Sequence, residues 1–367
     1  MAHHPAQYER MISAGLLAEL RRVAVEVPGV PDLRIAPTLR STFGEIDTPD
    51  ALRAVVRVYL ATRDELFGVL ARRDADRAFI DKYTADAAAR NAGVEYTSPQ
   101  YDTVIGKKDS TGRVVIGPTE CAFGPSDKVR VPPFLQGDQV ASRRYAKSHG
   151  PADLSLRQVT LFGPPDSAKM CISAMNSVHA QPAGEPSVVS ELVDLSQTVP
   201  RWGADNEDSK TPILSNLMAA SANLIHCFNK TIAFDDAATG KAYRLHTDRL
   251  AVPIKRVVGL ALPDGAHLFE GYPLPLHLYD FVMHAWHNRH HAEALVFYIP
   301  KLESEGDARY VKSLVTATER VLAEENRSYQ RGTIKLFIVR PSPFRLCGIV
   351  CRVSNSNQSR EDAARTN

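Results

Sequence analysis

A regular alternation of short apolar runs with helical segments, between residues 254 and 339, constrains the fold more than any other feature. The runs IKRVVGLAL, ALVFYIP and TIKLFIV are typical of buried strands. Between them, residues 275–291 and 307–326 place apolar side chains at helical spacing. Strands that alternate with helices in this way predict an α/β protein with a parallel sheet. An eight-stranded (β/α) barrel and an open, doubly wound sheet both fit the pattern.

The preceding hundred or so residues extend this pattern. LRQVTLFG and KMCISAM are predicted strands. Residues 211–228 are a predicted helix, with Thr211 as its N-cap and Pro212 in its first turn. The Pro-, Ser- and Gly-containing segment 179–200 is predicted to be an insertion.

The two flanking regions differ from this central part. Residues 8–25 and 50–92 have helical periodicity, whereas residues 93–155 contain clusters of Gly, Pro, Ser and Lys. We therefore expect an α-rich N-terminal domain and connection at residues 1–150, followed by the parallel α/β part at residues 151–339. For residues 340–367 we expect a divergent polar tail, rich in Ser and Asn.

Charge and apolar content exclude several classes of protein. The 44 Lys and Arg residues nearly balance the 42 Asp and Glu residues, unlike in a nucleic-acid-binding domain. No apolar run approaches the roughly 20 residues of a membrane span, and the start, MAHHPAQYER, lacks the apolar core of a signal peptide. The last residues, ARTN, are not a peroxisomal tripeptide. We expect a cytoplasmic or peroxisomal protein, with its five cysteines reduced.

Acidic residues follow one predicted strand at the point where parallel α/β folds place their active sites. Asp205, Glu207 and Asp208 lie in the segment RWGADNEDS. Carboxylates of this kind suit Mg²⁺ or its bound waters. The alternative is a helix-entry loop with solvated acids.

Basic residues lie within one further predicted strand and directly after another. Arg256 lies in the apolar segment KRVVGLAL, where a guanidinium is costly unless it is paired. It either holds an anion at the strand end or snorkels at a sheet edge. In PKLES, Lys301 and Glu303 stand where a barrel active-site loop begins. The alternative is an ordinary polar loop in which Ser304 or Asp307 caps the next helix.

Histidines form a third candidate site. His284, His287 and His291 share one face if the predicted helix 275–291 continues through all three, which makes a metal site geometrically feasible. No Glu stands at the spacing of an HExxH motif. The alternative is an amphipathic helix with half-buried and solvated imidazoles.

Six motifs, taken in order, resemble the malate synthase family and are closest to its shorter form. They are PADLSLRQVTLFGPPDSAKM, GADNEDSKTP, KRVVGLALPDG, FVMHAWHN, FYIPKLES and QRGTIK, and they span about residues 150–338. The resemblance implies a TIM-type (β/α) barrel preceded by an α-rich N-terminal domain. Because it ends after about the fourth strand, it implies a partial, truncated barrel.

The resemblance also implies a magnesium-dependent Claisen condensation, in which acetyl-CoA and glyoxylate give malate and CoA. Arg256 matches, by its R-x-x-G context, the arginine that offsets charge developing on oxygen. Asp205 and Glu207 match carboxylates that lie near the metal without binding it directly. Lys301 and Glu303 match the family's YLPKxES loop.

Departures from the family pattern predict impaired activity. The family's magnesium ligands are a glutamate after RGTIK and an aspartate in the next unit, but Arg340 and Pro341 stand where the glutamate is expected. The family's catalytic aspartate, in a C-terminal domain, has no match either. The abrupt change at residue 340 favours a truncated or misread reading frame. A half barrel exposes two apolar edges, so we expect poor folding alone or association through these edges.

Three alternative functions remain open at this stage. One is condensation of a different acyl-CoA with a different 2-oxo acid, which fits Val258 in place of the short form's second arginine. Another is a non-catalytic interaction protein that pairs through the open barrel edges. The third is a zinc protein built on the helix histidines.

Overall fold

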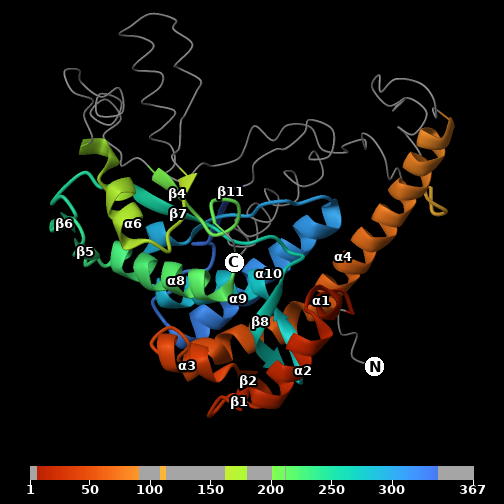
Figure 1. Cartoon of the computed structure of the whole chain (residues 1–367), viewed down its shortest axis with the longest axis horizontal. Coiled ribbons are helices and arrows are strands. Elements are labelled where there is room, and N and C mark those ends of the chain that lie inside the picture. Colours follow the sequence, from red (N-terminus) through yellow and green to blue (C-terminus); the bar gives the residue numbers. More distant parts are fainter. Residues whose placement is uncertain (1–5, 91–107, 113–161, 180–200, 211, 338–367) are drawn as a thin grey trace, which may run out of the picture.

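The computed structural model describes residues 6–90, 108–112, 162–179, 201–210 and 212–337 (Figure 1). Most of the connection predicted at residues 93–155 lies outside these ranges. So do most of the strand predicted in LRQVTLFG, most of the predicted insertion, and the tail at residues 340–367.

Five parallel strands form the central sheet of the described part. They are β3 (Phe162–Gly163), β4 (Arg201–Asp205), β7 (Val252–Arg256), β10 (Val296–Tyr298) and β11 (Lys335–Phe337). Their order is β11-β10-β7-β4-β3, and each neighbouring pair is parallel. The predicted parallel sheet is confirmed. Its strands follow one another in chain order, without the reversal that a doubly wound sheet contains.

This sheet is strongly curved. The rings of Phe162 in β3 and Tyr298 in β10 have their centroids 6.0 Å apart, although two strands separate β3 from β10. On a flat sheet, strands in these positions stand about 14 Å apart. The side chains of Phe162 and Tyr298 therefore meet on the concave face.

Helices connect the successive strands: α6 (Ala168–Met175), α8 (Leu214–Phe228), α9 (Leu276–His287) and α10 (Glu305–Glu325). The predicted helices corresponding to α8, α9 and α10 are confirmed. However, α8 begins at Leu214, so Pro212 precedes the helix and the proposed cap Thr211 lies outside the described residues. No helix in the described ranges is long and apolar enough to cross a membrane.

Two strand predictions are wrong. KMCISAM is the helix α6, because Ser167 accepts a hydrogen bond from the backbone N–H of Met170 and caps it. Its buried residues include Cys171, Ile172 and Met175, which share a helical face. The strand predicted at residues 254–262 ends at Arg256, since the chain then turns and Leu262 N–H bonds to the carbonyl oxygen of Gly259.

The N-terminal segment contributes both helices and strands. Its helices are α1 (Ala6–Met11), α2 (Ala14–Val23), α3 (Pro37–Phe43) and α4 (Pro49–Arg90), and its strands are β1 (Val25–Glu26) and β2 (Leu33–Ile35). β2 pairs with β8 (Pro263–Phe269), which pairs with β9 (Tyr272–Pro275), in an antiparallel sheet of order β1-β2-β8-β9. Smaller elements are the hairpin of β5 (Ala233–Asp236) and β6 (Lys241–Arg244), and the 3₁₀ turns η3 (Ser177–His179) and η4 (Ala292–Ala294).

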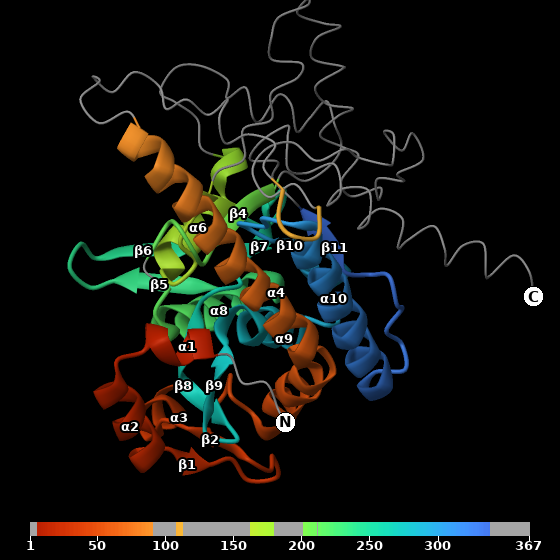
Figure 2. The ribbon, with the colours of Figure 1, turned by 90° about the vertical axis from the view of Figure 1, so that its right-hand side faces the viewer.

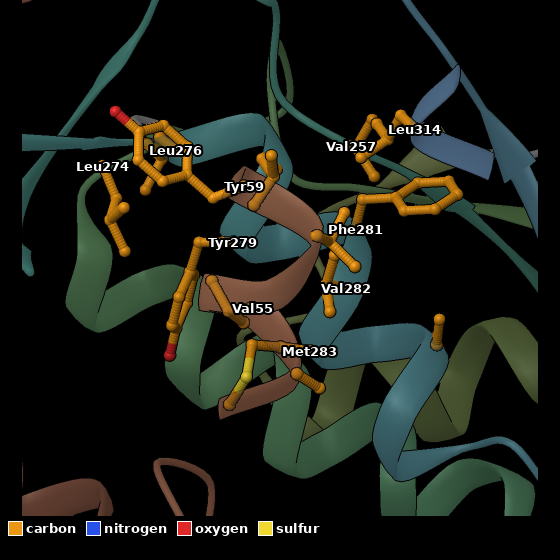
Figure 3. Packing of buried hydrophobic residues seen from close by; sticks show 14 of the residues in the cluster. Val55, Tyr59, Val257, Leu274, Leu276, Tyr279, Phe281, Val282, Met283 and Leu314 are labelled. Carbon is orange, nitrogen blue, oxygen red and sulfur yellow. The ribbon is translucent and has the colours of Figure 1, made fainter. Parts of the chain in front are cut away.

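The N-terminal helix α4 shares one hydrophobic core with the helices α8, α9 and α10. Figure 2 shows α4 lying across α9 and α10, with which it is in contact. In Figure 3, Val55 and Tyr59 of α4 lie among Tyr279, Val282 and Met283 of α9. All five side chains are almost fully buried. The domain boundary predicted at residue 150 lies outside the described residues.

Candidate functional site

Three strands of the parallel sheet end in side chains that meet at its C-terminal edge. Asp205 is the last residue of β4, Arg256 of β7 and Tyr298 of β10. The strand register places Asp205 opposite Arg256 and Arg256 opposite Tyr298. The guanidinium carbon of Arg256 lies 4.9 Å from the centre of the Tyr298 ring. The sequence therefore predicted the position of Arg256 correctly, but not its stacking on Tyr298.

Arg256 is surrounded by three carboxylates. Its Nη1 donates to Asp205 Oδ2 at 2.8 Å, and its Nη2 donates to Glu207 Oε2 at 3.0 Å and also to Asp208. The side chain is only 12% exposed. Its Nε is buried and makes no hydrogen bond among the described residues. A buried donor without a partner is unusual in a folded protein, so the surroundings of Arg256 are incomplete among the described residues.

Asp205 shapes the loop that carries the other two carboxylates. It accepts hydrogen bonds from the backbone N–H groups of Glu207 at 2.9 Å and Asp208 at 3.3 Å, and from the Ser209 hydroxyl at 2.8 Å. This is the local turn that Asp favours after a strand. Asp205 is thus fully engaged in holding the loop and Arg256.

Lys301, from the loop after β10, completes the cluster. Its Nζ lies 3.0 Å from Asp208 Oδ1 and 3.2 Å from Glu207 Oε1. Its hydrogen bond lowers the pKa of Asp208, and the same bond raises the pKa of Lys301. Burial raises the pKa of Glu207 in spite of the nearby Lys301 and Arg256. We name Asp205, Glu207, Asp208, Arg256 and Lys301 the carboxylate–arginine cluster.

Glu303 does not join this cluster. Its carboxylate is 52% exposed and lies 3.5 Å from Arg73 of α4. The structure therefore brings together five of the six charged candidate residues and leaves out Glu303. Asp307 takes the role of a helix cap, since it forms a capping box with Ser304 at the start of α10.

A close backbone approach at Gly259 leaves room for Glu207. A Cβ atom at position 259 would lie 2.8 Å from Glu207 Oε1. We predict that Gly259→Ala lowers the free energy of unfolding by about 1–3 kcal/mol, because the buried Glu207 must move. Urea unfolding followed by circular dichroism measures the change. Gly265→Ala is the matched control, since no atom lies within 4 Å of its added Cβ, and an equal loss there would contradict the prediction.

A buried ion pair lies beside this loop. Lys255 and Asp280 are fully buried, with Lys255 Nζ 2.6 Å from Asp280 Oδ1. Asn206, between Asp205 and Glu207, donates its side-chain amide to the same Asp280 oxygen at 3.0 Å. The pair thereby ties helix α9 to the loop of the carboxylate–arginine cluster.

The histidines do not form the proposed metal site. The helix α9 ends at His287, so His291 leaves the face that His284 and His287 share. His284 is buried and its Nε2 lies 3.0 Å from the Ala294 carbonyl oxygen, while His287 Nε2 lies 2.8 Å from that of Ile46. His291 contacts Asn229 instead. The alternative, half-buried and solvated imidazoles, fits His287 and His291, whereas His284 is fully buried.

The described residues do not fit a direct magnesium site. Arg256 or Lys301 contacts every carboxylate of the cluster, so cations already occupy the places that a metal would take. No group of three or more His, Cys, Asp or Glu residues in the described ranges could hold a metal ion. The magnesium that the resemblance implies therefore has no ligand set here.

A cavity of about 430 Å³ lies at the opposite end of the sheet. It is lined by residues at the start of β4 and β7, among them Arg201, Val252 and Pro253, and by Cys227 and Phe228 at the end of α8. Because Asp205 and Arg256 end the same strands, this cavity is separate from the carboxylate–arginine cluster.

Comparison with known proteins finds malate synthases, although no family model matches the sequence. Malate synthase A of Escherichia coli (strain K12) is 32% identical over 219 residues, which are 57% of this chain and 35% of the relative. Malate synthase of Streptomyces clavuligerus is 30% identical over 52% of this chain and 31% of its own length. The glyoxysomal malate synthase of Ricinus communis is 31% identical over 37% of this chain and 24% of its own length.

The resemblance to malate synthases is therefore confirmed, at about 30% identity over about half of the chain. The matched region spans about a third or less of the length of these curated relatives.

Proposed function

We propose that the carboxylate–arginine cluster belongs to a site for condensation of acetyl-CoA with glyoxylate, giving malate and CoA. The observation that carries the proposal is Arg256, which three carboxylates hold at the sheet edge while its Nε stays without a partner among the described residues. Similarity to malate synthases supports the choice of reaction. The curved parallel sheet supports a (β/α) barrel, of which the described strands are a part.

The role of Arg256 follows from its charge and surroundings. When a carbon nucleophile attacks the glyoxylate aldehyde, negative charge develops on the aldehyde oxygen. A fixed guanidinium lowers the free energy of that state, provided that it need not reorient during the reaction. Asp205, Glu207 and Tyr298 hold Arg256 from three sides, which supplies this fixed orientation.

Charge balance limits what this cluster does by itself. Two cations, Arg256 and Lys301, face three carboxylates, so the cluster has a formal charge of −1 when all are ionised. That excess opposes the anionic glyoxylate. Arg256 or Lys301 pairs with each carboxylate of the cluster, which weakens all three as bases for the acetyl methyl group. We therefore propose that condensation by this chain is slow.

Release of CoA, read with a thiol reagent, tests the proposed function. The purified chain is incubated with acetyl-CoA, glyoxylate and Mg²⁺, with the Escherichia coli relative as positive control. We expect slow release that requires glyoxylate and that falls about 10²–10³-fold in Arg256→Met. Release that is independent of either glyoxylate or Arg256 would contradict the proposal, provided that circular dichroism shows the variant folded.

Of the two alternative functions, the structure favours one and weakens the other. Full pairing of the carboxylates, without a metal-binding group among the described residues, favours a non-catalytic interaction protein. Measuring the mass of the purified chain in solution tests its association through open sheet edges. The second alternative is condensation of a different acyl-CoA with a different 2-oxo acid. Val258 does not support it, because this residue is fully buried in the core and does not line the cluster. A panel of such substrates in the same assay tests that alternative.

A further inference from the structure

We propose that Arg73, on the N-terminal helix α4, is a positioning residue for Lys301 and so sets the electrostatics of the carboxylate–arginine cluster. The inference deepens the proposed function and rests on it for any catalytic consequence. The test of this inference does not require catalytic turnover, so its failure can be told apart from failure of the proposed function. No motif in the sequence places residue 73 near the site, because α4 precedes all strands of the parallel sheet.

Arg73 makes three hydrogen bonds to Asp307 and Lys301, which we call the Arg73 clamp. Arg73 Nη2 donates to Asp307 Oδ2 at 2.8 Å and to the Lys301 carbonyl oxygen at 3.0 Å. Its Nε donates to Asp307 Oδ1 at 3.4 Å. The Arg73 side chain is 13% exposed and that of Asp307 is 0% exposed. Solvent therefore screens this pair far less than a surface ion pair.

Asp307 extends the clamp into the loop after β10. It accepts hydrogen bonds from the backbone N–H groups of Glu303 at 2.6 Å and Ser304 at 3.1 Å, and from the Ser304 hydroxyl at 3.1 Å. The Arg73 guanidinium balances the charge of this buried carboxylate. Arg73 and Asp307 together fix both ends of the segment from Lys301 to Ser304.

Lys301 needs this support because its backbone is strained. Its φ of +53° lies in the left-handed region, which is unfavourable for a residue with a Cβ. Arg73 holds the carbonyl oxygen of this same residue. Released from the clamp, the residue relaxes toward ordinary backbone angles, and its side chain leaves Glu207 and Asp208.

The reactivity of the Lys301 amine measures its position. Limiting acetic anhydride is added to the folded chain, and acetylation of each lysine is quantified by mass spectrometry. The ion pairs with Asp208 and Glu207 raise the pKa of Lys301 and keep its amine protonated. Loss of these ion pairs lowers the pKa of Lys301 toward its ordinary value and so increases the fraction of free amine. In Arg73→Met we expect acetylation of Lys301 to rise about 3–10-fold relative to Lys230, which lies beyond α8.

A matched control lies on the same pair of helices. Arg57 of α4 forms exposed ion pairs with Glu324 and Glu325 at the other end of α10. In Arg57→Met we expect unchanged reactivity of Lys301. Arg73→Lys keeps the charge but loses the forked donor, so we expect an intermediate rise, and it serves as the test variant if Arg73→Met does not fold.

The outcomes are distinct. A selective rise at Lys301 in the Arg73 variants alone supports the positioning role. Unchanged reactivity of Lys301 in a folded Arg73 variant overturns it, as does an equal rise in Arg57→Met or at all lysines together. Absence of CoA release from the unmodified chain would count against the proposed function and would leave this result standing.

Discussion

Replacing Lys255 by methionine is expected to lower the free energy of unfolding by about 3–5 kcal/mol, the usual cost of breaking a buried ion pair. Lys255 is completely buried in β7, and its partner Asp280 is 1% exposed. Without the ammonium group, burial raises the pKa of Asp280 further, with only the hydrogen bonds from Asn206 and the Val258 backbone to oppose it, or else a poorly compensated carboxylate stays in the core. Urea unfolding followed by fluorescence and circular dichroism measures the loss.

The double variant Lys255→Met with Asp280→Leu separates the ion pair from simple packing. Because it removes both charges, we expect it to regain most of the lost free energy. A single variant that costs less than about 1 kcal/mol would show that the pair contributes little. A double variant that loses the sum of both single effects would show that the two residues act independently.

Acidification from pH 7 to pH 5 is expected to remove about 4 kcal/mol of stability through two buried histidines. Burial lowers the pKa of His277 to about 3 and that of His284 to about 3. In the unfolded chain both titrate near pH 6.5, so the unfolded state binds more protons between pH 6.5 and 3. Stability is complete above pH 6.5 and falls as the pH drops. Urea midpoints at half-unit pH intervals measure the slope.

Single substitutions identify the histidines responsible. His277→Gln or His284→Asn each removes one titrating group, so we expect either to halve the slope of stability against pH below 6.5, whatever its effect at pH 7. An unchanged slope in both variants would assign the acid sensitivity to other groups.

The contribution of His267 to stability depends on pH in the opposite direction to that of His277 and His284. Burial opposes its protonation, but Asp264 and Asp47 raise its pKa to about 10. Its contribution is therefore complete below pH 6.5 and is lost as the pH rises toward 10. We expect stability to be greatest near neutral pH.

The sequence predicted the elements of the parallel sheet best where periodicity was long and clear. The helix α10, with buried Val311, Leu314 and Val321 on one face, was predicted within two residues at each end. KMCISAM was too short for its period to separate strand from helix, and its capping Ser167 decided the outcome. The sheet formed by β1, β2, β8 and β9 was missed, because its pairing joins segments far apart in the chain.

For the candidate site too, residues marked by local sequence pattern could be predicted, and residues placed by tertiary packing could not. Asp205 ends β4 and Glu207 follows it, so their place at one edge could be predicted from the rule that parallel strands end together. Arg256 reaches the same edge because β7 ends there, six residues before the end of the predicted strand. Tyr298 also ends a strand, and its position two residues before Pro300 is a sequence signal that places it at the same edge. Arg73 had no such signal, because only tertiary packing brings α4 to the loop after β10.

The pairing of β2 with β8 also sets a time scale for synthesis. Leu33 pairs with Phe269, so about 230 residues must follow β2 before its partner exists. At about 5–20 residues per second, a ribosome needs about 10–50 s to make them. Leu33 and Ile35 are almost fully buried in the finished fold. Until β8 has been made, the edge of β2 that pairs with it has no partner strand. The nascent chain therefore presents an apolar strand edge that a chaperone can bind, long before the carboxylate–arginine cluster can assemble.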